Sequence, residues 1–335
     1  MSKRSILGLG IAALVALVLP LVVKDQYVQH VAIVTFIYIG ITVAWNLMAI
    51  GGTLSVGHAA FFGVGAYTTA ILFIKFGVNP WVGILLSMVT SALTALLLVV
   101  PLLRLRGPFF TLSSLAFVEV LRLLAIWAVP VTNGSSGLTT PSDQGFAYIS
   151  FENREPYYYI VLAFVIIVVA FSVWLYGSKV GYHLRALKTD EQALRALGVR
   201  TNGLKISIMV ISAAITGAFG AFSAIYYFVI EPETQFSMML YSVQPALNGI
   251  IGGMGTVVGP IIGAVLMTPL GEWLHTAFSG AQGVNFMIYG LVLIVIVRLL
   301  PGGLVDGWNR LFSRKQTSRI SSDAAETSAA KGGEE

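Results

Sequence analysis

Two glycine-rich stretches decide the fold of this chain. They read Asn46-Leu-Met-Ala-Ile-Gly-Gly-Thr-Leu-Ser-Val-Gly-His-Ala-Ala-Phe-Phe-Gly-Val-Gly-Ala66 and Asn248-Gly-Ile-Ile-Gly-Gly-Met-Gly-Thr-Val-Val-Gly-Pro-Ile-Ile-Gly263, and each interrupts a long apolar run. A backbone broken inside a membrane costs several kcal/mol for each unpaired polar group, unless protein or a water-filled cavity satisfies that group. Two similar interruptions, far apart in the sequence, predict a translocation path rather than a passive anchor.

The composition predicts an all-α polytopic integral membrane protein. The 335 residues are 56% hydrophobic and only 10% charged, whereas soluble domains carry roughly 25% charged residues. Between Asp25 and Arg104 the one formally charged side chain is Lys75. The apolar runs are continuous, which favours membrane helices over the alternating segments of a β-barrel.

We expect about eight to ten transmembrane helices, with the glycine stretches breaking two of them. The predicted spans are 6–23, 30–50, 55–76, 82–103, 109–128, 157–176, 206–230, 239–252, 256–275 and 285–300. The segment 239–252 is short and forms either a half-span or a helix joined to its successor. The N-terminal apolar run resembles a signal peptide, but no small-residue cleavage site precedes Lys24, so we expect a retained first helix.

The charge distribution predicts the orientation. Lys and Arg gather at the N-terminus, in the loop 177–205 and in the tail 306–335, so these regions should face the cytoplasm. The more acidic loops 129–156 and 231–237 should face outward, on the periplasmic side. We therefore expect a transmembrane domain over 1–305, both termini in the cytoplasm and a polar, disordered tail.

The glycine stretches also form a weak internal repeat. Gly51–Gly52 matches Gly252–Gly253, and Val56–Gly57 matches Val258–Gly259. Both copies should run from outside to inside and back. The residues predicted to belong to the translocation path are Asn46, Gly51, Gly52, Gly57, His58, Asn248, Gly252, Gly253 and Gly259.

The loop 177–205 contains a predicted docking helix. Thr189-Asp-Glu-Gln192 is a capping-box pattern, with Thr189 as the expected N-cap. The helix should run through Leu197 and end at Gly198. Ala193, Leu194 and Leu197 form one apolar stripe, which suits a soluble protein partner. The alternative is an interfacial helix that lies on lipid.

Several motifs together resemble one family. They are Gly181-Tyr-His-Leu-Arg-Ala-Leu-Lys-Thr-Asp-Glu-Gln-Ala-Leu-Arg-Ala-Leu-Gly-Val199, Gly57-His-Ala-Ala-Phe-Phe-Gly-Val-Gly-Ala-Tyr67, Arg106-Gly-Pro-Phe-Phe-Thr-Leu112, Asn133-Gly-Ser-Ser-Gly-Leu-Thr139 and Gly252-Gly-Met-Gly-Thr-Val-Val-Gly-Pro260. They resemble the membrane permease subunits of branched-chain amino-acid ABC importers, and the chain looks like the second, slightly larger permease of the pair. The resemblance runs in order from about residue 30 to 305.

The resemblance implies partners and a coupling site. It implies a heterodimer of two homologous permeases, two ATP-binding subunits below them and a periplasmic solute-binding protein above. The loop 181–199 would be the coupling helix that docks on the ATPase, and the residues matching that motif are Arg185, Asp190, Glu191, Ala193, Leu197 and Gly198. Tyr182 departs from the basic residue common in relatives, which puts in doubt a specific ion pair there.

Three further features have more than one possible interpretation. His58 either lines the path or makes a structural hydrogen bond. Glu119 and Arg122 can pair at i, i+3, as a structural lock or as part of the pathway. The outward loop 133–141 is expected to be flexible, and it either contacts the binding protein or closes a gate, or is plainly solvated.

Other functional classes are excluded or less favoured. The chain has no cysteine, no metal-ligand spacing among its four histidines and no phosphate-binding loop, so we expect neither catalytic residues nor a metal site. ATP and Mg²⁺ should bind to partner subunits only. The net charge of +5 sets topology rather than nucleic-acid binding, and membrane lipid is the expected surroundings. The function that the family resemblance implies is import of leucine, isoleucine and valine across a bacterial inner membrane. The rivals are urea, short amides or another small organic acid as cargo, or an ATPase-independent secondary transporter.

Overall fold

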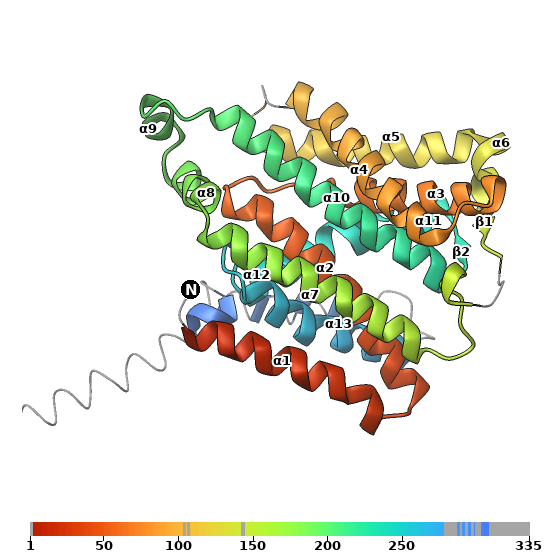
Figure 1. Ribbon diagram of the computed structural model, residues 1–335. Helices are drawn as coiled ribbons and strands as arrows, with labels where there is room; N and C mark the ends of the chain where they lie inside the picture. The colour runs from red at the N-terminus through yellow and green to blue at the C-terminus, as the bar shows by residue number, and fades with distance from the viewer. Residues whose placement is uncertain are drawn as a thin grey trace, which may run out of the picture.

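Long helices make up most of the chain (Figure 1). The computed structural model describes residues 3–102, 105, 108–141, 145–277, 287–288, 290–291, 294–295, 298 and 303–307. The long helices are α1 (Lys3–Val22), α2 (Gln26–Ile50), α3 (His58–Phe76), α4 (Pro80–Leu102), α5 (Pro108–Trp127), α7 (Glu155–Gly177), α10 (Thr201–Tyr227) and α13 (Gly259–Ala277). The shorter elements are α6 (Val129–Thr132), η1 (Gly134–Ser136), β1 (Leu138–Thr139), η2 (Phe146–Tyr148), α8 (Lys179–Thr189), α9 (Glu191–Ala196), β2 (Val229–Ile230), α11 (Pro232–Gln235), the π-helix η3 (Met239–Val243) and α12 (Gln244–Gly252).

The long helices run between two ends of the molecule. One end carries α8 and α9, and the other carries the β1–β2 ribbon (Figure 1). Within the described residues, α2, α3, α4, α5, α7 and α10 are long and apolar enough to cross a membrane. The segments α1, η3–α12 and α13 run beside them. The chain is therefore an all-α, multi-pass membrane protein; most of the predicted span 285–300 and the tail 308–335 lie outside the described residues.

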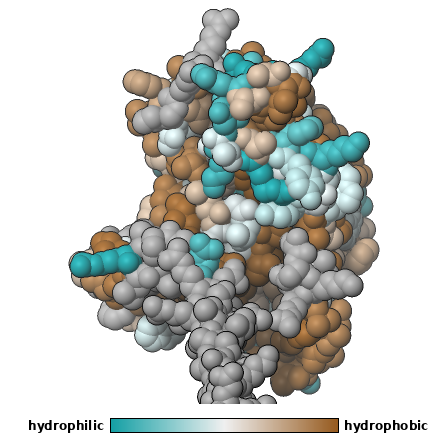
Figure 2. Space-filling model, turned by 90° about the vertical axis from the view of Figure 1, so that its left-hand side faces the viewer, coloured by the Kyte–Doolittle hydropathy of each residue, from teal (hydrophilic) through white to brown (hydrophobic). Residues whose placement is uncertain are grey.

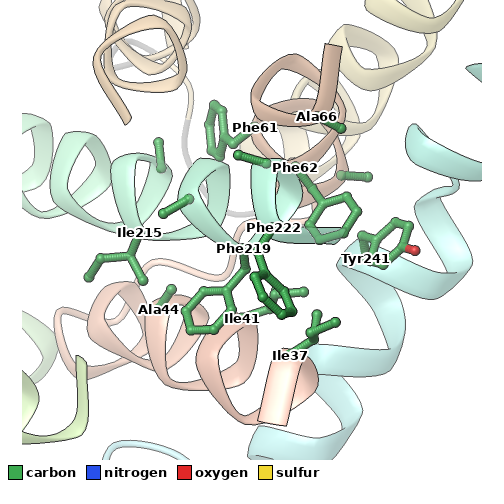
Figure 3. Packing of buried hydrophobic residues seen from close by; sticks show 14 of the residues in the cluster. Ile37, Ile41, Ala44, Phe61, Phe62, Ala66, Ile215, Phe219, Phe222 and Tyr241 are labelled. Carbon is green, nitrogen blue, oxygen red and sulfur yellow. The ribbon is translucent and has the colours of Figure 1, made fainter. Parts of the chain in front are cut away.

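The core is packed around α10, which lies against α3, α4 and α2. Glycines bring these backbones into direct contact. A Cβ on Gly65 of α3 would lie 2.2 Å from the carbonyl oxygen of Gly217, and one on Gly220 would lie 2.1 Å from that of Phe62. Figure 3 shows the aromatic layer beside this contact, where the Phe62 ring stacks on Tyr241 with centroids 3.7 Å apart. Close packing through small residues is the usual basis of helix association in membranes.

The segment 133–141 is folded, in contrast to the flexible loop that the sequence suggests. Leu138 and Thr139 pair antiparallel with Ile230 and Val229. The Asn133 side chain donates to the carbonyl of Gly137 at 2.9 Å. These bonds tie the segment to the chain that follows α10, so its glycine and serine content reflects tight turns rather than freedom.

Both glycine stretches lie at the α8–α9 end. The helix α2 ends at Ile50 and the chain returns as α3. Likewise, η3–α12 ends at Gly252 and the chain returns as α13. The two copies thus run in the same sense, as predicted. The fourteen residues of η3–α12 rise about 21 Å as a helix, which is less than the roughly 30 Å hydrocarbon thickness. This segment is therefore short, as its sequence indicates.

Candidate functional site

The first break, residues 51–57, is held by side chains from neighbouring helices. The Trp45 indole N–H donates to the carbonyl of Ser55 at 2.9 Å. The backbone N–H of Val56 donates to the Ser114 hydroxyl of α5 at 3.3 Å. The interrupted helix thus finds protein partners for backbone groups that would otherwise be costly within a membrane.

The second break, residues 253–258, is bonded to the first repeat through Asn46. The Asn46 side chain is fully buried near the end of α2. Its Nδ2 donates to the carbonyl of Thr256 at 2.7 Å, and its Oδ1 accepts from the N–H of Gly255 at 2.8 Å. One amide therefore binds both a donor and an acceptor of a segment about two hundred residues away. These two hydrogen bonds connect the end of α2, just before the first break, to the second break.

Glycines let α12 and α13 touch at the second break. A Cβ on Gly252 would lie 1.8 Å from the carbonyl oxygen of Gly259, and one on Gly263 would lie 1.8 Å from that of Asn248. Real Cβ atoms do not approach so closely, so these positions require glycine. The repeated small residues therefore serve direct backbone packing.

The loop helix α8 packs against both breaks. Its Leu184 is fully buried, and a Cβ on Gly51 would lie 3.2 Å from the Leu184 side chain. A Cβ on Gly52 would lie 3.2 Å from Cα of Lys188, and one on Gly255 would lie 3.6 Å from the Lys188 ammonium. The last turns of α8 therefore pack on the first break, and the Lys188 ammonium lies beside Gly255 of the second break.

The predicted N-cap of the second loop helix is wrong by one residue. Thr189 completes α8, where its hydroxyl donates to the carbonyl of Arg185. The cap is Asp190, whose carboxylate accepts from the N–H groups of Gln192 and Ala193 at 2.8 and 3.0 Å. Asp190 has the extended backbone that an N-cap needs, and a carboxylate is favourable at a helix N-terminus.

The helix α9 ends as expected, but its apolar residues do not share one face. Gly198 adopts a left-handed conformation with φ of 83° directly after the cap, which explains the glycine. Leu194 is buried against the protein body, whereas Ala193 and Leu197 are exposed, Leu197 by 81%. The single stripe predicted from the sequence is thus wrong, because Leu194 points inward. The outward face available to a partner consists of Ala193 and Leu197.

Glu191 fastens α9 to α10. Its carboxylate pairs with Lys205 at 2.8 Å and with Arg195 at 2.7 Å. Burial raises the pKa of the Glu191 carboxyl, but the hydrogen bonds and positive charges of Lys205 and Arg195 outweigh this effect and hold the pKa below its ordinary value of 4.5. Glu191 therefore makes its ion pairs within the protein and holds α9 against α10.

Arg185 is also used within the protein. Its guanidinium donates to the carbonyl of Tyr176 at 2.8 Å and lies over the rings of Tyr176 and Tyr182, 4.3 and 4.5 Å from their centroids. Tyr182, the departure from the family pattern, thus supplies a cation–π surface for Arg185. This arrangement fixes the corner between α7 and α8.

A cavity of about 790 Å³ opens between the first break and the loop. Figure 2 looks onto this end, where hydrophilic residues gather in the upper half of the view and apolar surface flanks them. The α2 side contributes Met48 and Gly52–Leu54, while Glu191 and Lys205 contribute the charged wall. The remaining lining comes from α4, α5, α10 and Leu105 between α4 and α5, and it is mainly apolar: Val99, Leu102, Leu105, Phe110, Thr111, Leu112 and Met209.

The structure places most predicted path residues in helix packing. Of the nine, Gly52 lines this cavity. His58 is fully buried, and its Nε2 lies 2.9 Å from the Ser212 hydroxyl. Since Ser212 donates to the carbonyl of Ala44 at 2.7 Å, the Nε2 of His58 donates to Ser212. This bond matches the structural interpretation of His58. The role of the nine residues in a path stays a prediction.

Sequence reasoning missed the small hydroxyls and lysines that hold the site together. Ser114 and Ser242 bond to the backbone of the first break and of α3, and Lys188 contacts both breaks. Lys205 ties α10 to the loop. A serine inside an apolar span is a weak signal for such a bond, but it does not identify the partner.

Comparison with known proteins was made with this geometry in hand. A family described as "Branched-chain amino acid transport system / permease component" matches residues 27–297. The high-affinity branched-chain amino acid transport system permease protein LivM of Salmonella typhimurium is 27% identical over 299 residues, which cover 82% of this chain and 69% of that protein. A probable LivM of Methanocaldococcus jannaschii is 24% identical over 294 residues, 79% of this chain and 83% of that protein.

A second kind of permease also matches, over less of the chain. LivH of Salmonella typhimurium, also named as a high-affinity branched-chain amino acid transport system permease protein, is 25% identical over 184 residues. These cover 53% of this chain and 58% of LivH. No solved structure matches. The likeness is thus to LivM over most of the chain and to LivH over about half.

Proposed function

Because the chain belongs to the family of branched-chain amino acid transport system permease components, we propose that it is the LivM-like transmembrane permease of an ATP-driven importer in a bacterial inner membrane. Its cargo would be leucine, isoleucine and valine. The names of the relatives support this substrate class. The α8–α9 end, which carries the basic loop, would face the cytoplasm, because excess Lys and Arg stays on that side.

The proposed assembly contains a second homologous permease, two ATP-binding subunits and a periplasmic solute-binding protein. LivM and LivH relatives carry the same system name, which supports a pair of permeases. The sequence lacks a phosphate-binding loop, so ATP and Mg²⁺ would bind to separate chains. The binding protein would supply most of the substrate specificity, since the cavity offers few polar groups.

The observation that carries this proposal is the contact of α8 with both glycine breaks. An ATPase that docks on the exposed Ala193–Leu197 face of α9 would move the loop. The packing of Leu184 and Lys188 would pass that movement to the ends of both broken spans. Asn46 would keep the two breaks moving together. Such a shear of packed elements is a known way to open alternate sides of a path.

The test is recovery of the partners with a tagged protein from native membranes. We expect an ATPase with a phosphate-binding loop and a second permease to co-purify, and radiolabelled leucine uptake to need ATP. Leu197→Asp should abolish ATPase recovery while leaving thermal stability within about 0.5 kcal/mol, because Leu197 is exposed. The matched Leu194→Ala should instead destabilise the buried side of α9 by about 2–3 kcal/mol.

Three results would each contradict a part of the proposal. Uptake that continues in a strain without any cognate ATPase would indicate a secondary transporter. Uptake of urea or short amides but not of leucine would keep the architecture and change the cargo. If the Leu197→Asp protein still bound the ATPase at wild-type level, α9 would not be part of the docking site.

A further inference from the structure

The outward face of α5 is unusual among the membrane-spanning helices. Most of its exposed residues repeat at intervals of three and four, which places them in one stripe along the helix. The stripe is Phe109, Leu112, Ala116, Glu119, Leu123 and Trp127, and the exposed Val120 and Leu124 widen it along one edge. Of the six long apolar spans of the described chain, α5 is the least buried. A carboxylate thus stands in the middle of an otherwise apolar surface.

Glu119 belongs to a cluster of three charges. Arg122 pairs with Glu119 one turn away, as the sequence predicts, and also with Glu233 of α11. The Glu119 side chain is 48% exposed and that of Glu233 is 64% exposed. The cluster carries two negative charges and one positive charge, so it has a net charge of −1 on the surface of the subunit.

This cluster cannot face lipid at low cost. The span Phe109–Trp127 has 19 residues, barely enough to cross a bilayer, so its whole length is needed. Glu119 lies eight residues before Trp127, about 12 Å below that end. Ionisable groups at such depth face protein or water.

Other outer helices provide the comparison. The exposed residues of α7 from Ala163 to Trp174 are Ala163, Ile166, Ile167, Ala170 and Trp174, all apolar; its exposed carboxylate, Glu155, is the first residue of the helix. The exposed face of α4, which includes Leu85, Val89, Leu93 and Leu97, has the same character. Both faces suit lipid. The α5 stripe differs by its charges.

We propose that the α5 stripe is the contact face for the second permease subunit, and that the cluster Glu119–Arg122–Glu233 lies between the two subunits. This inference rests on the proposed function, which supplies the second permease. That subunit is the fitting occupant, because relatives of two kinds carry the name of one transport system. It would present a cation or a polar group to the net negative cluster. The same helix lines the cavity at Phe110, Thr111 and Leu112, so the contact face and the cavity share α5.

Photocrosslinking in the intact complex tests this assignment. A benzophenone amino acid would replace Ala116 or Leu123 on the stripe, with Leu97 on α4 and Ile167 on α7 as matched exposed controls. After irradiation of native membranes, adducts would be identified by mass spectrometry. We expect the stripe positions to give adducts with the second permease, and the controls to give none.

The other outcomes overturn the proposal in distinguishable ways. If the second permease co-purifies but its adducts come only from Leu97 or Ile167, or from no position, the α5 assignment fails and the proposed function stands. If the residue at position 116 or 123 crosslinks to a second copy of this chain, the stripe is a contact between two copies of this chain and the proposed partner is wrong. If no second permease co-purifies, both the contact face and the proposed pair of permeases fail.

The charge provides an independent test. Glu119→Leu would make the stripe fully apolar. If the stripe met the second permease through the cluster, recovery of that subunit should fall roughly tenfold, as expected for loss of a buried interfacial charge contact. The yield of the variant chain itself should be unchanged. Unaltered recovery of the second permease would contradict the placement of the cluster between the subunits.

Discussion

Asn46 offers the sharpest test of the link between the two glycine breaks. Asn46→Leu keeps the size and shape of the side chain but removes the hydrogen bonds to Thr256 and Gly255. Because Asn46 is fully buried, leucine should fit without a large cavity. The change therefore isolates the polar connection from the packing.

The expected cost follows from the two orphaned backbone groups. A buried donor or acceptor left without a partner costs about 1–3 kcal/mol. Gly255 and Thr256 are only partly buried, so water can reach them and the lower half of that range applies. The sum for the two groups is about 2–4 kcal/mol. A loss of this size corresponds to a fall in Tm of about 5 °C.

The assay is thermal unfolding in detergent followed by size-exclusion chromatography, together with leucine uptake in membranes. The matched control is Thr42→Val, one turn earlier on α2, where a buried hydroxyl has no hydrogen-bond partner within the described residues. That change should leave Tm equal or slightly higher. If Asn46→Leu behaved like Thr42→Val in both assays, the proposed link between the breaks would be wrong.

Four further predictions concern the core and the loop. Gly252→Ala should cost about 3 kcal/mol and lower Tm in detergent, because a carbonyl of α13 lies 1.8 Å from the new Cβ. Gly203→Ala, whose Cβ has its nearest neighbour at 3.9 Å, should stabilise the helix by about 0.5–1 kcal/mol. Ser212→Ala should lower stability by about 1–3 kcal/mol, because the His58 Nε2 donor loses its acceptor. The Glu191 tie should be present above pH 4.5 and lost as the pH falls through its lowered folded-state pKa. Hydrogen exchange of α9 should therefore rise only below pH 4.5 in the native protein, and show no such step in Glu191→Gln.

Much of the helical layout follows from local sequence signals. The predicted span 30–50 corresponds to α2, and 157–176 to α7, because uninterrupted apolar length identifies a membrane helix. Gly198 ends α9 as its position suggests. The glycine stretches coincide with breaks at 51–57 and 253–258. All these features depend on residues close together in the chain.

The tertiary partners could not be predicted in the same way. Nothing in the local sequence indicates that Asn46 binds Thr256, since the two are 210 residues apart. The Glu191–Lys205 pair fixes one side of α9 to α10 across fourteen residues of sequence, and Leu194 of the same short helix is buried. Thr189 and Asp190 are adjacent candidates for the N-cap of α9. Because Thr189 is the last residue of α8, Asp190 is the cap.

The position of the loop suggests why its two helices are separate. The helix α8 packs on the first break through Leu184 and Lys188, and the Lys188 ammonium lies beside Gly255 of the second break. The helix α9 is tied by Glu191 to α10, which packs on α3 and α4. The cavity lies between these two attachments, with Gly52 on one wall and Lys205 on the other. We therefore expect a force on the loop that moves Glu191 of α9 relative to Gly52 to change the width of the cavity. A single rigid helix in place of the bend at Asp190 would hold both walls at a fixed distance and could not transmit that change.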